Sequence, residues 1–190
     1  MLSSKIEKLK QTPLSETDIL KKLNGKTTIY KYNELINFKS VEEMLGRYDN
    51  CVILLETEEN FGHWVCIKVT GKRISFFDSY GGFPDRQKHF VNEDFLKSSG
   101  QEFNKLCQLL YECSFRYTVE FSQRPLQNIR NLKLATCGLW CCVFIKSGLT
   151  VDPFYEFIDS FNMKDKDALV VMLYYDLPIK NDSKKKKIMI

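Results

Sequence analysis

Residues 135–145 read Ala-Thr-Cys-Gly-Leu-Trp-Cys-Cys-Val-Phe-Ile, and the rest of the chain is expected to pack around this stretch. From Leu139 to Ile145 every residue is apolar, so the pattern predicts a helix that is buried on all sides. Cys137 is its first residue. A thiol in the first turn of a buried helix lies against the positive end of the helix dipole, which favours the thiolate and lowers its pKa. Gly138 leaves room for another backbone to approach Cys137 closely.

Buried cysteines are also ordinary core residues. Free Cys is among the most buried residue types, and we interpret Cys141 and Cys142 as core. The same interpretation is open for Cys137, because only a neighbouring base would make it a nucleophile. The role of Cys137 therefore depends on a partner elsewhere in the chain.

The composition bounds the class of protein. With 190 residues, of which 44% are hydrophobic and 13% aromatic, the chain fits one globular domain with a full core. No apolar run is long enough to span a membrane and no signal peptide is recognisable, so no membrane partner is expected. Seven cysteines, an odd number at irregular spacing, indicate reduced thiols and an intracellular protein.

The net positive charge of the chain is concentrated at its C-terminal end. Residues 180–190 hold five lysines and one aspartate, which accounts for the whole net charge of +4, so residues 1–179 balance to zero. We therefore predict a single domain over residues 1–179, followed by a basic, disordered tail over residues 180–190. Any attraction to nucleic acid is expected to reside in this tail.

A candidate base lies in a predicted β-hairpin. The alternation of residues over 62–78 predicts two strands joined by a turn centred on Thr70-Gly71. Such a turn pairs His63 with Asp78 at the end of one sheet face. A His beside an Asp is more often a surface pair, but this pair closes an apolar face. A shift of the turn by one residue would pair His63 with Ser79 instead.

A thiol, an imidazole and a carboxylate together suit acyl transfer. His63 would take the thiol proton, Asp78 would fix the tautomer of His63, and the thiolate of Cys137 would attack a carbonyl. The developing oxyanion needs hydrogen-bond donors, and the backbone N–H of Cys137 is one candidate. The other would be a side-chain amide before the helix, where the chain offers Gln123, Gln127, Asn128 and Asn131.

A zinc site is the competing use of these residue types. The potential ligands are His63, Cys66, Cys137, Cys141 and Cys142. However, Cys66 falls on the opposite face of its strand from His63, and the adjacent Cys141 and Cys142 cannot easily point at one ion. The chain also has no phosphate-binding glycine loop. We therefore expect no metal and no other cofactor.

Four motifs follow one another in the order His, acid, Gln, Cys. They are His63-Trp64, Phe77-Asp78-Ser79-Tyr80-Gly81-Gly82-Phe83, Gln127, and Cys137-Gly138-Leu139-Trp140-Cys141-Cys142-Val143-Phe144. This set resembles the adenovirus maturation protease (adenain) family of cysteine peptidases, in the clan that contains the SUMO-specific proteases. The likeness spans residues 60–149. The flanks resemble versions encoded by virophages and related mobile elements such as mavirus.

The resemblance implies an α+β fold of the papain-like or adenain-like kind, in which a central mixed β-sheet packs against the buried helix that carries the nucleophile. It implies Cys137 as nucleophile, His63 as general base, Asp78 as the acid that orients it, and Gln127 as oxyanion donor.

The chain departs from the family pattern at two positions. Family members commonly have the Gln closer to the Cys, where this chain has Arg130 or Asn131. A loop insertion would reconcile the spacing, and Asn131 stays open as the donor in place of Gln127. The acid of the adenovirus enzymes is a Glu, whereas Asp is usual elsewhere in the clan.

The implied function is a cysteine endopeptidase that cleaves viral precursor or capsid proteins during virion maturation, in the virion, the host cytoplasm or the virus factory. In adenovirus enzymes a basic surface binds DNA and a viral peptide activates the enzyme. By analogy, the Lys184–Lys187 run would contact DNA and a peptide activator would be a further partner. Two alternatives stay open: a deconjugating protease for ubiquitin-like modifiers that cuts a Gly-Gly isopeptide bond, and a non-catalytic binding module of the same fold.

Overall fold

The structure of the chain is a computed structural model that describes residues 2–179. The predicted basic tail over residues 180–190, with its Lys184–Lys187 run, lies outside the described residues. Within the described part, no helix has the length and apolar character needed to cross a membrane.

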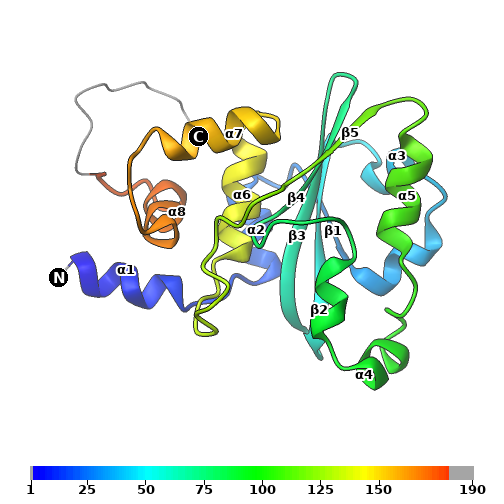
Figure 1. Ribbon diagram of the computed structural model, residues 1–190, viewed down its shortest axis with the longest axis horizontal. Helices are drawn as coiled ribbons and strands as arrows, with labels where there is room; N and C mark the ends of the chain where they lie inside the picture. The colour runs from blue at the N-terminus through cyan, green and yellow to red at the C-terminus, as the bar shows by residue number, and fades with distance from the viewer. Residues whose placement is uncertain (1, 180–190) are drawn as a thin grey trace.

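A mixed β-sheet of five strands forms the centre of the fold (Figure 1). The strands lie in chain order: β1 (Thr28–Lys31), β2 (Asn50–Glu58), β3 (Phe61–Thr70), β4 (Arg73–Asp78) and β5 (Thr118–Phe121). The central pairs β2–β3 and β3–β4 are antiparallel, whereas the edge strands β1 and β5 run parallel to their neighbours. β2 and β3 are buried on both faces over most of their length, which explains their nearly continuous apolar runs.

Helices cover both faces of this sheet (Figure 1). One face packs against α6 (Cys137–Ser147), together with α1 (Leu2–Lys10), α2 (Glu16–Lys22), α7 (Val151–Asp159) and α8 (Lys166–Tyr174). The other face carries α3 (Val41–Leu45), α5 (Lys105–Cys113) and the short 3-10 helix η1 (Tyr32–Asn37). The 3-10 helix η2 (Arg86–Phe90) and α4 (Glu93–Ser98) connect β4 to α5. A mixed sheet packed against a buried helix that starts at Cys137 confirms the predicted α+β class.

Helix α6 is buried on nearly every side, as its sequence predicts. Trp140 and Phe144 are fully buried, and the Phe144 ring stacks on Phe77 of β4 with ring centroids 4.5 Å apart. The helix ends at Gly148, which takes a left-handed φ of +66°. Lys68 of β3 is itself buried and donates to the carbonyl of Phe144 at 3.0 Å, so a cation faces the negative end of the helix dipole.

The N-terminal segment closes tightly over the start of α6. Ser15 and Asp18 form a capping box that starts α2 and fixes the chain direction at Leu14. The carbonyl of Leu14 accepts a hydrogen bond from the indole N–H of Trp64 at 3.2 Å. A Cβ added to Gly138 would lie 3.1 Å from Trp64 and 3.2 Å from Leu14. Gly138 therefore allows a close approach as predicted, but by the side chains of Trp64 and Leu14 and not by another backbone.

The β3–β4 hairpin has a different register from the one predicted. Its turn starts one residue later, at Gly71, because this residue takes φ +58° at the first position of a two-residue turn, where glycine is favoured. Val65, and not His63, therefore lies directly opposite Asp78. The alternative pairing of His63 with Ser79 is also wrong, because moving the turn by one residue shifts every pair by two positions. His63 lies two residues further along the same face of β3, which puts the two side chains in a diagonal relation.

Gly62 precedes His63 in β3, and a Cβ added there would lie 2.0 Å from the carbonyl oxygen of Leu55 in β2. We expect Gly62→Ala to push the two strands apart and to lower the free energy of unfolding by about 2 kcal/mol or more. Gly138→Ala is the matched comparison. Its Cβ would meet side chains no closer than 3.1 Å, and alanine is the better helix former, so its loss should be smaller. Urea denaturation measures both variants, and equal losses would contradict the close approach at Gly62.

Candidate active site

A cleft of about 860 Å³ opens where β3 begins and α6 starts. Cys137 and His63 both line it. Its walls come from the start of α2, the end of β1, η2 and the loop over residues 129–135.

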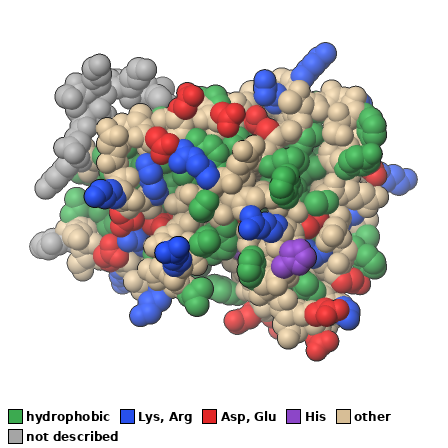
Figure 2. Space-filling model, in the orientation of Figure 1, with side chains coloured by type: hydrophobic (Ala, Val, Ile, Leu, Met, Phe, Trp, Pro, Cys, Tyr) green, Lys and Arg blue, Asp and Glu red, His purple; other side chains and the backbone are tan. Residues whose placement is uncertain are grey.

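On the face of the molecule drawn in Figure 2, basic and acidic side chains are interspersed, in keeping with the charge balance of residues 1–179.

The imidazole of His63 is held by Asp78. His63 Nε2 lies 2.7 Å from Asp78 Oδ1, and the two residues are only 6% and 1% exposed. Because the carboxylate accepts the Nε2 proton, the neutral ring carries its lone pair on Nδ1. Nδ1 is buried and makes no hydrogen bond within residues 2–179. The ring is therefore set to receive a proton from a neighbour on its Nδ1 side.

Asp78 is itself fixed from three directions. Its Oδ1 accepts the backbone N–H of Tyr80 at 2.8 Å, and its Oδ2 accepts the Gln87 side-chain N–H at 2.9 Å. Its own backbone N–H donates to Ser122 Oγ at 2.8 Å. The Tyr80 ring also stacks on His63, with centroids 4.1 Å apart and planes 13° apart. Both acceptor oxygens and the imidazole are thus held in one geometry.

The sequence did not point to the supporting roles of Tyr80, Gln87 and Ser122. Tyr80 belongs to the motif around Asp78, so its nearness to the site could have been inferred. Gln87 lies nine residues beyond Asp78 in a short 3-10 helix, and Ser122 lies 44 residues beyond it. No local pattern marks either residue, because the chain path that brings each one to Asp78 is a tertiary feature.

His63 and Cys137 each shift the pKa of the other in the direction that favours its charged form. Burial acts to lower the pKa of His63, but the Asp78 carboxylate and the Cys137 thiol outweigh it and raise that pKa to about 10. Burial acts to raise the pKa of Cys137, but the neighbouring His63 imidazole outweighs it and holds the pKa below its ordinary value. The backbone N–H groups of Trp64 and Gly138 act in the same direction. The arrangement favours a thiolate facing an imidazolium.

Cys141 and Cys142, which follow Cys137 in α6, differ from it in pKa and in location. Burial raises the pKa of Cys141 well above its usual range and that of Cys142 to about 12. The Cys141 thiol lies 3.5 Å from the carbonyl of Trp64, inside the core. All seven cysteines are unpaired, and no three His, Cys, Asp or Glu side chains of residues 2–179 are grouped so as to hold a metal ion. Among the cysteines of α6, only Cys137 combines a lowered pKa with a place on the cleft.

The loop before α6 brings Gln127, and not Asn131, to the interior. Gln127 is 3% exposed; its Oε1 accepts from Ser79 Oγ at 2.9 Å and its Nε2 donates to the carbonyl of Leu134 at 3.4 Å. The amide carries a second N–H that can serve another acceptor. Asn131 is exposed, and its side-chain oxygen accepts the backbone N–H of Lys133. Burial and anchoring therefore favour Gln127 as the side-chain donor.

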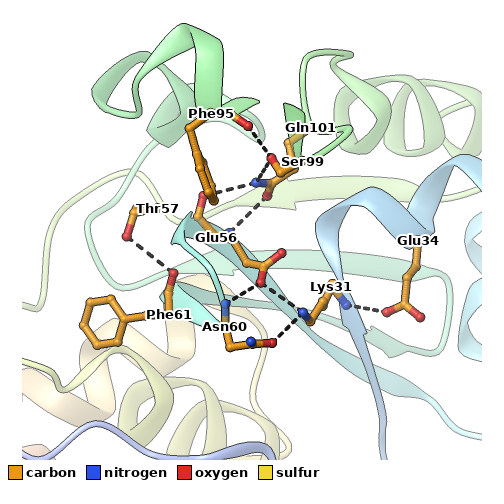
Figure 3. Close-up of polar contacts among 9 residues, drawn as sticks. All are labelled: Lys31, Glu34, Glu56, Thr57, Asn60, Phe61, Phe95, Ser99 and Gln101. Carbon is orange, nitrogen blue, oxygen red and sulfur yellow. Dashed lines mark hydrogen bonds and ion pairs between the residues drawn. The ribbon is translucent and has the colours of Figure 1, made fainter. Parts of the chain in front are cut away.

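A polar network around the buried Glu56 lies where β2 ends and β3 begins (Figure 3). Glu56 is 4% exposed, and its Oε1 accepts from Lys31 Nζ at 3.1 Å and from the backbone N–H of Asn60 at 2.8 Å. The Gln101 side chain bonds both the N–H and the carbonyl of Glu56, as a neighbouring strand would. This network fixes the irregular end of the β2–β3 pair and so the strand start that carries His63.

Comparisons relate the chain to known proteins. No family model matches it. It is 34% identical over 167 residues to the "Uncharacterized protein V9" of the Sputnik virophage, an alignment that covers 84% of this chain and 93% of that protein. Among solved structures it is similar to the ASFV pS273R protease, with TM-score 0.41, 14% identity, and coverage of 89% of this chain and 68% of that one. It is also similar to ChlaDub1 from Chlamydia trachomatis, with TM-score 0.35, 17% identity, and coverage of 74% and 66%.

The lowered pKa of Cys137 predicts one unusually reactive thiol. At about pH 6 to 7, below the ordinary thiol pKa of about 8.5, iodoacetamide should alkylate Cys137 much faster than the other cysteines. His63→Ala removes the imidazolium that stabilises the thiolate, so the pH of half-maximal alkylation should rise. Mass spectrometry of tryptic peptides identifies the labelled residue, and Cys137→Ala is the control. Seven uniformly slow thiols in the wild type would contradict the assignment.

Proposed function

The chain belongs to the same protein family as the V9 protein of the Sputnik virophage, and we propose that it is a cysteine endopeptidase that cleaves viral structural precursor proteins during virion maturation. The chemical part of this function is supported by the cleft, and the biological part by the family.

The observation that carries the chemical part is the convergence of Cys137, His63 and Asp78 at one end of the sheet. The imidazole is 2.7 Å from a buried carboxylate, its pKa responds to the nearby Cys137 thiol, and both Cys137 and His63 line an open cleft. A nucleophile, a base and an orienting acid in this order are the requirements of covalent acyl transfer. A binding module would have no need of a thiol with a lowered pKa.

The reaction follows from this geometry. The Cys137 proton passes to His63 Nδ1, and the thiolate adds to the carbonyl carbon of the scissile bond, whose π electrons move to oxygen. The Cys137 N–H and the Gln127 amide would donate to this oxyanion. His63 then gives its proton to the leaving amine, and the chain is acylated on Cys137. Water, deprotonated by His63, attacks the thioester, and release of the acid restores the thiol and imidazole.

The biological part rests on kinship with a virophage protein and on the adenain-like order of the motifs. A maturation enzyme of this kind would act in the virion or in the virus factory of the host cytoplasm, on capsid or other precursor proteins. DNA contact through Lys184–Lys187 and activation by a viral peptide remain hypotheses of the same proposal.

Cleavage of a peptide library made from virophage structural proteins tests the proposal. We expect the wild type to generate new N-termini, detected by mass spectrometry, and Cys137→Ala to generate none, because the nucleophile is lost while only a small buried side chain is removed. Thermal unfolding of the variant checks that the fold is kept. Equal cleavage by both proteins would refute the role of Cys137. Release of a reporter from the C-terminal Gly-Gly of a ubiquitin-like protein, without cleavage of the library, would favour a deconjugating protease instead.

A further inference from the structure

A buried carboxylate outside the proposed triad lies beneath the loop that leads into α6. Asp167, in the first turn of α8, is 2% exposed. Its Oδ1 accepts the Thr136 hydroxyl at 2.5 Å, and its Oδ2 accepts the backbone N–H of Asn128 at 2.9 Å. A buried carboxylate is costly unless its oxygens are hydrogen-bonded. Both carboxylate oxygens of Asp167 accept a hydrogen bond, and both donors belong to the same loop.

The two partners of Asp167 each border a proposed oxyanion donor. Asn128 directly follows Gln127, and Thr136 directly precedes Cys137. One carboxylate therefore ties together the two ends of the segment over residues 128–136. Two apolar residues between these ends add little core packing, since Leu132 is 96% exposed and Ile129 is 54% exposed. Other ties of this segment are the hydrogen bonds of the Gln127 amide to the carbonyl of Leu134 and of the Ala135 N–H to the carbonyl of Lys10.

The Thr136 hydroxyl does not make the hydrogen bond that is usual for a threonine at its position. Thr136 is the N-cap residue of α6, where a threonine side chain ordinarily accepts a hydrogen bond from the first-turn N–H groups. Here it makes no such cap bond and donates to Asp167 instead. An ionised carboxylate only accepts hydrogen bonds, so the hydroxyl must point its proton at Asp167. The first-turn N–H groups of α6 are left uncapped by this side chain.

We propose that Asp167 is a positioning residue for the oxyanion hole, acting through Thr136 and Asn128 to set the separation of the Cys137 N–H and the Gln127 amide. The inference rests on the proposed peptidase function. Donors must lie within about 2.7 to 3.1 Å of the oxyanion, and a displacement of about 1 Å can cost on the order of 10²-fold in rate. Asp167 itself touches neither substrate nor thiol.

Thr136→Val is the central variant, because it is close in shape and removes only the hydroxyl that meets Asp167. We expect kcat for the best-cleaved library peptide to fall about 10- to 100-fold with KM little changed. The affinity for a peptide aldehyde of the same sequence should fall by a similar factor, since addition of Cys137 Sγ to its carbonyl also makes an oxyanion. The alkylation rate of Cys137 by iodoacetamide should be unchanged, because that reaction makes no oxyanion.

Four further variants are compared with Thr136→Val. Gln127→Ala should reproduce the Thr136→Val pattern and Asn131→Ala should leave all three readouts at wild-type values. Thr136→Ser keeps the hydroxyl and should restore kcat. Thr27→Val removes another buried threonine hydroxyl, which donates to the carbonyl of Thr28, and controls for a general loss of packing.

The outcomes separate this inference from the proposed function. A Thr136→Val enzyme with unchanged kcat and aldehyde affinity would overturn the role of Asp167 while the peptidase function stood. A parallel fall in alkylation rate would also overturn it, because the variant would then act on the thiolate rather than on the oxyanion. A wild type that neither cleaves the library nor binds any of its aldehydes would overturn the proposed function, and this inference with it.

Discussion

The hydrogen bond between His63 and Asp78 is the contact on which the site depends. Asp78 is almost completely buried, so its charge must be compensated, and the imidazole, the Tyr80 N–H and the Gln87 amide compensate it. The same bond fixes the tautomer that leaves Nδ1 open toward Cys137. Removing the carboxylate would therefore change the orientation of the His63 ring and its pKa together.

The fold assembles this site around the end of the sheet. The side chains of Val65 and Phe76, on the same face as His63 and Asp78, pack toward α3 and α5, whereas α6 packs on the other face. Cys137 reaches His63 because the first turn of α6 lies against Trp64, the next residue of β3. The two apolar layers are rigid and closely packed, so a thiol from one and an imidazole from the other keep a fixed separation.

Much of this arrangement could be predicted from the sequence, since the decisive patterns are local. The all-apolar run after Cys137 predicted a buried helix with the cysteine at its start, and the alternation over residues 62–78 predicted the hairpin. The register was wrong because one residue, Gly71, decides where the turn begins. The diagonal reach of His63 preserved the contact with Asp78 despite that difference.

Other parts could not be predicted, for physical reasons. Strand β1 is short and half-buried throughout, so it has neither an apolar run nor an alternation. The preference for Gln127 over Asn131 depends on the path of a loop that Ser79 anchors from 48 residues away. Asp167 meets Thr136 across 31 residues, and nothing in the local sequence of α8 distinguishes it from a solvated helix-start aspartate.

The protonation state of His63 tests the account most directly, and with only two histidines in the chain its ¹⁵N NMR signals can be assigned by comparison with a His89→Gln variant. If the imidazole is held between Asp78 and a thiolate, both ring nitrogens should carry protons at about pH 7.5 and should lose one only as the pH nears the raised pKa of about 10. A neutral imidazole at that pH, titrating near the ordinary value of about 6.5, would contradict the ion pair and the activation of Cys137 that depends on it.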